Sequence, residues 1–379
     1  MQDRGSERRT ARLMVESAVA LIGVACVATA VLAHQPWLDR HFLPSFFVTR
    51  RDYVMRETVV RITLAVLGVL LVMFVRPRLG RFVARSPAIA LGAVLAAVLA
   101  LGASEFVLRH VHLRPAEWLG RDQEPRRQPD PRLGWTFVPF RSGQSTIGGR
   151  VVDYTFDAAG YRVGRPGEHV DPARPTILFM GESVMFGTGL AWEETVPAQV
   201  GVMTGTQSAN LAVDGFSTDQ SYLRLETELP RFRQPVAVVA IFMTTLFGRN
   251  LDDDRPHLAP GLVWRPGVAH GRLRSLVQLV APYRSRATVE RGITVTREVL
   301  RATAELATAR GAVPLVLIPH FGPEDQVEQT LRQRIFDEAG LPYVLVGIDP
   351  AWRVPGDVHP NARAAHEMAT AIVARLTKS

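Results

Sequence analysis

Residues 176–187 read TILFMGESVMFG, an apolar run that stops at Gly-Glu-Ser and then resumes. The first part has the length and composition of a buried strand, Thr176–Met180, and the resumed run predicts a helix directly behind it. Ser183 therefore stands at the carboxyl end of a strand. A serine in that place is either the N-cap of the following helix or a nucleophile. The rest of the chain has to distinguish the two.

Apolar runs and helical stretches alternate through the C-terminal two thirds of the chain. The expected strands are Thr176–Met180, Ala209–Val213, Val236–Met243, Val313–Pro319 and Tyr343–Val346. The expected helices are Glu193–Val202, Thr218–Leu229, Val289–Arg310, Glu324–Ala339 and Asn361–Thr377. This alternation predicts an α/β domain whose parallel sheet is covered by helices on both faces. Two phrases ahead of it, GWTFVPF and RVVDYTF, look like short additional strands.

The first 110 of the 379 residues contain three apolar stretches, at about 13–33, 59–75 and 87–107. Each is close to the roughly 20 residues that a helix needs to cross a bilayer. We therefore expect residues 1–110 to form a membrane region with three transmembrane helices. A cleaved signal peptide is the main alternative for the first stretch, but a clean small-x-small cleavage site is missing.

Arginine is concentrated in the N-terminal tail and in the short loop after the second apolar stretch. The positive-inside rule places both segments in the cytoplasm and everything after the third helix outside. Residues 111–131 are polar and rich in proline, most clearly over Arg114–Asp130, which predicts a linker. Residues 132–379 then form the outer domain.

The formal charge of +8 does not favour nucleic acid as a partner, because no basic stripe interleaved with aromatic residues follows the apolar segments. Cys26 is the single cysteine, so an intrachain disulfide and a cysteine zinc site are excluded. Asp252, Asp253, Asp254 and His257 are a metal-site alternative, but consecutive acids in a loop are usually solvated. We expect no metal and no cofactor.

Residues suited to acyl transfer follow the predicted strands in order. In an open parallel sheet the active crevice lies outside the carboxyl ends of the strands. There Ser183 would attack a carbonyl carbon, His359 would take the serine proton, and Asp357 would orient the imidazole. The main-chain N–H groups of Ser183 and Gly215, with the side-chain amide of Asn250, are candidates for an oxyanion hole.

Four blocks around these residues resemble the SGNH, or GDSL-type, hydrolase superfamily. MGESVMFG resembles its first block, with Glu182 where aspartate is usual, NLAVDGFS its second, FGRNLDDD its third and GDVHPNARAAH its last. The chain departs from the pattern at Leu251, where aspartate usually follows the asparagine, and in the last block, where two rather than three positions separate aspartate from histidine. LGW and FDAAGYR are similar to phrases of bacterial members that carry N-terminal membrane helices.

The resemblance covers about residues 130–379. It implies a flavodoxin-like three-layer α/β/α sandwich with a parallel sheet, and the cleavage or transfer of acyl groups through an acyl-enzyme. With the predicted helices it implies a multi-pass protein of the bacterial inner (cytoplasmic) membrane, its N-terminus cytoplasmic and its catalytic domain periplasmic. The expected partners are the bilayer and an O-acyl ester of an envelope glycan or lipid. Glu182 and His320 are further candidates to line the substrate site.

Three alternatives to this esterase remain, and one of them, a binding or scaffolding protein, belongs to another functional class. An α/β-hydrolase would need glycine in the last position of Gly-x-Ser-x-Gly, where this chain has Met185. A binding or scaffolding protein could keep the fold without turnover. An O-acyltransferase could use the same serine, because either water or a sugar hydroxyl can resolve an acyl-enzyme.

Overall fold

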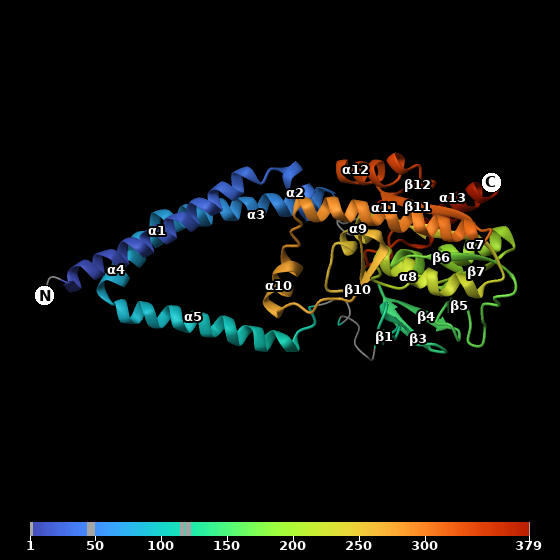
Figure 1. Ribbon diagram of the computed structural model, residues 1–379, viewed down its shortest axis with the longest axis horizontal. Coiled ribbons are helices and arrows are strands. Elements are labelled where there is room, and N and C mark those ends of the chain that lie inside the picture. Colours follow the sequence, from blue (N-terminus) through green and yellow to red (C-terminus); the bar gives the residue numbers. More distant parts are fainter. Residues whose placement is uncertain (1–2, 44–49, 114–116, 118–122, 379) are drawn as a thin grey trace. The chain divides into compact units, whose positions relative to one another are not determined.

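The computed structural model describes residues 3–43, 50–113, 117 and 123–378 (Figure 1). The chain divides into two compact units, each with its own internal packing. A helical unit takes in residues 1–42, 49–112 and 271–282, and an α/β unit takes in the remainder. Much of the expected linker, at 114–116 and 118–122, lies outside the described residues.

Most of the helical unit consists of long apolar helices. Its helices are α1 (Asp3–Leu32), α2 (Gln35–Phe42), α3 (Arg50–Leu70), the π-helical turn η1 (Leu71–Val75), α4 (Arg76–Arg85), α5 (Pro87–Val107), the 3-10 turn η2 (Leu108–His110) and α10 (Arg272–Val280). Three stretches are long and apolar enough to cross a membrane: Arg9–Leu32, Arg50–Arg85 and Pro87–His110. The second is longer than expected, because α3, η1 and α4 continue as one helical stretch through the arginine-rich flanks of the apolar run.

The α/β unit is built on a sheet of eight strands in the order β12-β11-β8-β6-β7-β5-β4-β3. Their bounds are β3 (Ser142–Ile147), β4 (Arg150–Phe156), β5 (Arg162–Val163), β6 (Pro175–Met180), β7 (Gln207–Asn210), β8 (Gln234–Ile241), β11 (Val313–Phe321) and β12 (Tyr343–Ile348). Two small antiparallel pairs lie apart from this sheet: β1 (Arg127–Asp130) with β2 (Gly134–Phe137), and β9 (His257–Ala259) with β10 (Val263–Arg265).

The five strands from β6 onward in this sheet are parallel to one another, and β3, β4 and β5 add an antiparallel extension beside β7. Counted along the chain, the parallel strands have the order 2-1-3-4-5, which is the flavodoxin-like order. The predicted fold class is therefore confirmed by the topology itself.

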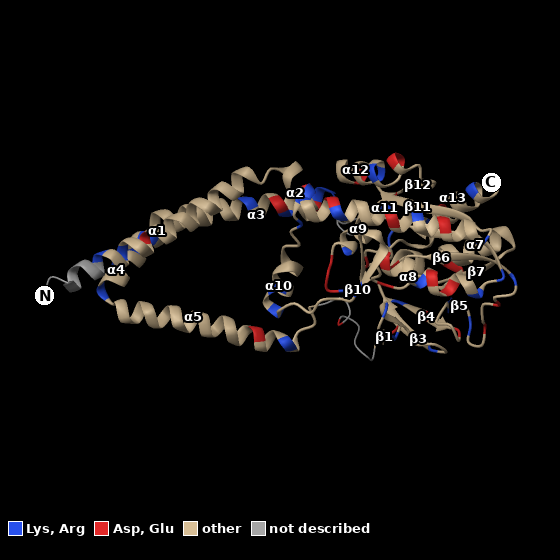
Figure 2. Ribbon diagram, in the orientation of Figure 1, with Lys and Arg blue, Asp and Glu red and all other residues tan. Residues whose placement is uncertain are grey.

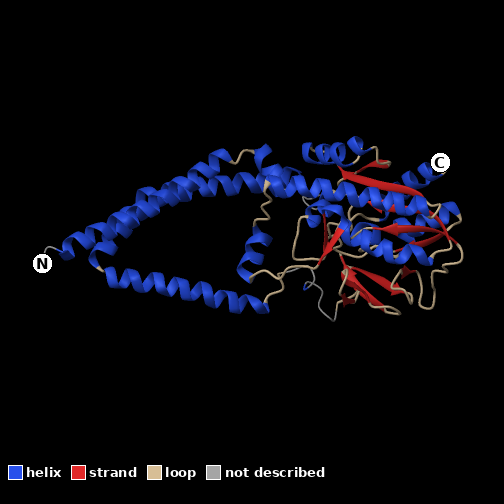
Figure 3. Ribbon diagram, in the orientation of Figure 1, coloured by secondary structure: helices blue, strands red, loops and turns tan. Residues whose placement is uncertain are grey.

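Helices cover both faces of the sheet (Figure 3). Helices α7 (Val196–Thr204) and α13 (Ala362–Leu376) pack together on one face, and α8 (Thr218–Glu228), α11 (Arg286–Ala309) and α12 (Gln326–Ile335) pack together on the other. Alternate residues of β6 enter the two cores: Ile177 and Phe179 belong to one, and Leu178 and Met180 to the other. Burial on both faces explains why these strands read as continuous apolar runs. The short elements are α6 (Ser183–Phe186), α9 (Thr244–Asn250), η4 (Trp192–Glu194), η5 (Leu229–Arg231), η6 (Pro260–Leu262) and η7 (Asp337–Ala339).

Strand β7 ends three residues earlier than its apolar run predicts. The run continues through Leu211–Val213, but these residues follow β7 as an irregular segment. They still hydrogen-bond to the end of β6, since the N–H of Leu211 donates to Phe179 O (2.8 Å) and that of Val213 to Gly181 O (3.1 Å). This segment leads the chain back past β6 toward Gly215.

The order of the strands places a switch point beside β6. From β6 the chain moves to β7 on one side, and after β7 it returns to β8 on the other side. In open α/β sheets, ligands bind outside the carboxyl ends of the strands at such a point. Ser183 follows β6 at this position.

Candidate active site

The turn that carries Ser183 is tightly packed against β8. Gly181 has φ +151°, and a Cβ there would lie 2.3 Å from Cγ2 of Ile241, so the backbone can pass β8 only as glycine. Glu182 is the N-cap of α6, and its Oε1 accepts from the N–H of Val184 at 3.0 Å. Ser183 is the first residue of α6 and is buried. The capping role that the sequence allowed for the serine belongs to Glu182, which leaves the serine hydroxyl available for chemistry.

Ser183, His359 and Asp357 form one chain of hydrogen-bond contacts. Nε2 of His359 lies 2.9 Å from Oγ of Ser183, and Nδ1 of the same ring lies 2.5 Å from Oδ1 of Asp357. The imidazole is 15% exposed. The three side chains thus have the order of contacts that a serine, histidine and aspartate triad requires.

The two-residue spacing of Asp357 and His359 is compatible with this contact because the segment between them turns sharply. Oδ1 of Asp357 also accepts from the main-chain N–H of His359 at 2.8 Å. The carbonyl of His359 accepts from the N–H of Val354 at 2.8 Å, which closes the loop. Asn361 is the N-cap of α13. Because Asn361 does the capping, Asp357 is free to hold the imidazole.

The surrounding charges favour the protonated form of His359. Burial is the largest influence and would lower the pKa of the imidazole, but the hydrogen bond to Asp357 and the negative charges of Glu182, Asp357 and Asp214 together raise the pKa above its ordinary value. The same hydrogen bond lowers the pKa of Asp357. The site is therefore arranged to stabilise an imidazolium beside Ser183.

Glu182 contacts the nucleophile directly. The Ser183 hydroxyl donates to Oε2 of Glu182, and Nη1 of Arg249 lies 3.3 Å from that oxygen and 3.1 Å from the carbonyl oxygen of Phe216. Glu182 is fully buried, so it lies behind Ser183 and does not line a surface that substrate can touch. Sequence reasoning missed Arg249, which has no signal beyond its place next to Asn250.

Gly215 lies in a loop that several side chains hold in place. Its φ is +74°, and its carbonyl accepts from Nη1 of Arg255 at 2.7 Å. Next to it, the carbonyl of Asp214 accepts from the indole N–H of Trp135 at 3.1 Å. Among the described residues, the main-chain N–H groups of Ser183 and Gly215 have no hydrogen-bond acceptor. Both donors are thus available to a ligand.

The structure does not direct the amide of Asn250 to Ser183. Its Oδ1 accepts from the N–H of Thr218 at 2.8 Å, and its Nδ2 donates to Oγ1 of Thr296 at 2.8 Å. These contacts connect the end of α9 with α8 and α11. Asn250 occurs one helix length beyond the end of β8, which is why its side chain serves helix packing.

Thr244 lies closer than Asn250 to the end of β8 along the chain. Met180 and Ala240 are paired across β6 and β8; Ser183 follows the first by three residues and Thr244 the second by four. Each of the two begins a helix, α6 and α9. Thr244 is 5% exposed, and its hydroxyl has no hydrogen-bond partner within the described residues. A buried hydroxyl without a partner is costly, so Thr244 is a candidate for the donor role that Asn250 does not fill.

Arg162, which belongs to the FDAAGYR phrase, supports the segment behind the nucleophile. Its guanidinium is buried and donates to the carbonyls of Phe186 (2.9 Å), Gly187 (2.7 Å) and Leu190 (2.5 Å). The charge also lies 4.6 Å from the ring centre of Tyr154. Burial lowers the pKa of Arg162 to about 10. One side chain thus fixes the C-terminal end of α6.

His320 is at the end of β11, two strands from β6 in the sheet, and its Nδ1 lies 2.7 Å from the carbonyl oxygen of Gly322. No described contact joins His320 to Ser183. Of the acids in the metal alternative, Asp252 pairs with Arg255, 3.6 Å away, and with Arg284, and Asp253 contacts His270 at 2.7 Å. Among the described residues no group of three or more His, Cys, Asp or Glu is arranged to hold a metal.

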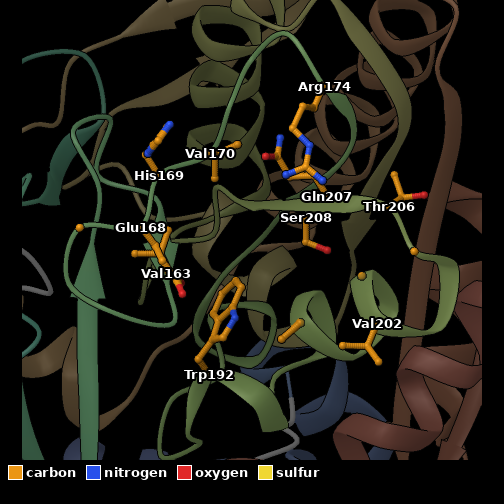
Figure 4. Close-up of a pocket in the computed structure, with 14 residues that line it drawn as sticks. Val163, Glu168, His169, Val170, Arg174, Trp192, Val202, Thr206, Gln207 and Ser208 are labelled. Carbon is orange, nitrogen blue, oxygen red and sulfur yellow. The ribbon is translucent and has the colours of Figure 1, made fainter.

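A separate cavity of about 660 Å³ lies near the amino end of β7 (Figure 4). Trp192, His169 and Arg174 are among its lining residues, and none of the triad residues lines it. Two other lining residues are already engaged: Gln207 bonds to Asp171 and Thr176, and Ser208 bonds to Pro197. The cavity is thus distinct from the Ser183 site.

No family model matches this chain, and no curated protein matches it. Among solved structures, a GDSL-like lipase from Bacteroides thetaiotaomicron is similar at 18% identity and a TM-score of 0.34, covering 54% of this chain and 88% of the lipase. A member of the lipolytic G-D-S-L family from Veillonella parvula has 14% identity and a TM-score of 0.33, and the match covers 54% of this chain and 99% of that protein. An acetyl xylan esterase from Butyrivibrio proteoclasticus has 10% identity and a TM-score of 0.36, and the match covers 56% of this chain and 66% of the esterase. The chain resembles GDSL-type hydrolases.

Proposed function

We propose that this protein is a serine esterase that works through an acyl-enzyme on Ser183. The observation that supports this most strongly is the continuous contact from Asp357 through His359 to Ser183 at the switch point of the sheet. If Ser183 served only to begin a helix, nothing would require an imidazole beside its hydroxyl.

In the proposed reaction, the hydroxyl of Ser183 turns from Glu182 toward Nε2 of His359 and gives its proton to the ring as Oγ attacks the ester carbonyl. The C–O bond to the leaving alcohol then breaks, and the imidazolium protonates that oxygen. Water attacks the acyl-enzyme by the reverse proton path, which releases the acid and restores Ser183. Asp357 holds the Nδ1–H throughout and stabilises the imidazolium.

The oxyanion would be stabilised by the two available N–H groups, of Ser183 and Gly215, with the hydroxyl of Thr244 as a third donor. The amide of Asn250 was the expected third donor, but it serves Thr218 and Thr296 instead. Thr244 is supported by its position after β8 and by its hydroxyl, which is buried without a partner. Preorganised donors of this kind are usually the largest contribution to such catalysis.

The substrate we propose is an O-acyl ester of an envelope glycan or lipid. Three helices suited to cross a membrane would hold the α/β unit close to such substrates. Arginines in the N-terminal tail and in α4 favour a cytoplasmic location for both, which would place the α/β unit in the periplasm of the inner membrane. Hydrolysis is preferred to transfer, because water needs no second binding site for an acceptor.

The test is covalent labelling of the full chain in detergent by a fluorophosphonate, together with hydrolysis of short acyl esters. Wild type is expected to be labelled, and Ser183→Ala should lose both labelling and hydrolysis. Ser142→Ala, which changes an exposed serine on β3, is the matched control and should behave as wild type. Wild-type protein that is neither labelled nor active would refute the esterase and favour the scaffolding alternative.

A further inference from the structure

Helix α10 belongs to the helical unit, although the chain on both sides of it belongs to the α/β unit. The two oxygens of the Glu105 carboxylate accept the N–H groups of Arg272 and Leu273, the latter at 2.9 Å. Glu105 is in the last turn of α5, within the candidate membrane span Pro87–His110. The N-terminus of α10 is therefore fixed at one end of that span.

Four of the five apolar residues of α10 share one face of the helix, and Leu279 lies outside it. Leu273, Leu276, Val277 and Val280 have the i, i+3, i+4, i+7 spacing of one helix face. Leu273 and Leu276 are half-buried, whereas Val277 and Val280 are 63% and 77% exposed. Only half of the apolar face is thus covered by the unit itself.

The neighbouring end of α5 presents the same kind of surface. Phe106 and Val107 are 63% and 61% exposed. Figure 2 shows α5 without charge until this end, where charged residues begin. If α5 spans a bilayer, its apolar side chains face lipid and its first charges mark the lipid–water boundary. The N-terminus of α10, which is bonded to Glu105, lies at that boundary, and Val277 and Val280 of the same helix are exposed as well.

We propose that α10 lies in the lipid–water interface and inserts Val277 and Val280 among the acyl chains. Figure 1 shows α10 running across the direction of α5, as a helix lying in the membrane plane would. Its first turn carries Arg272 and Arg274, whose charge suits anionic headgroups. The α/β unit is then attached to the bilayer at two places along the chain, after α5 and again through α10. This inference does not depend on the chemistry of Ser183.

The test measures the depth of single positions with an environment-sensitive fluorophore. Cys26→Ser removes the single cysteine and allows one label each at Val277→Cys, Val280→Cys or Gln278→Cys, the last on the polar face. Val202→Cys on α7, which is 85% exposed, is the aqueous reference. The full chain is reconstituted in vesicles of phosphatidylcholine and phosphatidylglycerol, with or without spin-labelled lipid, and circular dichroism confirms that each variant is folded.

Spin-labelled lipid is expected to quench the labels at 277 and 280 at least threefold more than those at 278 and 202, while aqueous iodide shows the opposite order. Two results would overturn the proposal. Labels at 277 and 280 that iodide reaches as readily as the label at 202 would place this face in water. Labels protected from both quenchers would mean that a second copy or another protein covers it.

Discussion

Arg249 and Ser183 share one oxygen of Glu182: the Ser183 hydroxyl donates to Oε2, and Nη1 of Arg249 lies 3.3 Å from the same atom. Oγ of Ser183 is also 2.9 Å from Nε2 of His359. The hydroxyl has one proton and two acceptors, so the charge state of its neighbours decides which acceptor receives it. This relationship makes the pH dependence of the site a direct test of its arrangement.

Glu182→Gln is expected to shift the pH profile to lower pH. Catalysis needs neutral His359, so activity should rise as pH passes through the pKa of the imidazole, which its carboxylate neighbours raise above the ordinary value. Removing the charge of Glu182 lowers that pKa, and the rising limb of kcat/KM moves down accordingly. Rates of an ester substrate measured across pH check this. The control is Glu168→Gln, which changes an exposed acid and should leave the rising limb of kcat/KM at its wild-type pH. A shift of that limb to higher pH in Glu182→Gln would contradict the proposed influence of Glu182 on His359.

Asp357→Asn should reduce kcat by about 10³ to 10⁴-fold while leaving the fold intact, because an amide no longer selects the productive tautomer or stabilises the imidazolium. Ester hydrolysis with thermal unfolding as a companion measurement checks this. Asp349→Asn is the control, since Asp349 is an exposed acid in the same connection between β12 and α13. Equal losses in the two variants would mean that Asp357 acts only on loop structure.

Thr244→Val should lower kcat by about 10²-fold with little change in KM if its hydroxyl stabilises the oxyanion. Thr244→Ser keeps the hydroxyl and should retain most of the activity. Asn250→Ala is the contrasting change: it removes contacts to Thr218 and Thr296 and should lower the free energy of unfolding by about 1 to 3 kcal/mol, with a smaller effect on kcat. A larger loss of kcat in Asn250→Ala than in Thr244→Val would return the oxyanion role to Asn250.

Arg162→Met should lower the free energy of unfolding by about 3 kcal/mol or more, because it leaves the carbonyls of Phe186, Gly187 and Leu190 buried without a donor. Thermal or denaturant unfolding measures the loss. Arg165→Met removes an exposed arginine three residues away and serves as the control, which should unfold like wild type. A stable Arg162→Met variant would show that water or rearrangement satisfies these carbonyls.

Much of the fold follows from patterns that depend on local sequence. Continuous apolar strands and amphipathic helices predicted the parallel α/β unit, and the order 2-1-3-4-5 confirms it. The end of β7 was misplaced because Leu211–Val213 stay buried and bonded to β6 without strand geometry, a distinction that hydropathy does not contain. The assignment of α10 to the helical unit depends on Glu105, more than 160 residues away, so no local pattern could indicate it.

Among the site residues, those within a compact phrase were easier to place. Asp357 and His359 are two positions apart, and the structure has the contact of Asp357 with His359 and that of His359 with Ser183. Asn250 was assigned from the order of the blocks, but order does not specify which turn after β8 points to the serine. Thr244 lacks a sequence signal, since only burial and the absence of a partner within the described residues distinguish its hydroxyl from others.

The return of the chain to the helical unit at residues 271–282 has a practical consequence for biochemistry. A fragment that begins after α5 would still contain α10, now without Glu105 to hold its N-terminus and with Val277 and Val280 exposed. Such a fragment is expected to associate with itself or with detergent. Replacing residues 271–282 by a short polar loop in the same fragment should yield a monodisperse α/β unit.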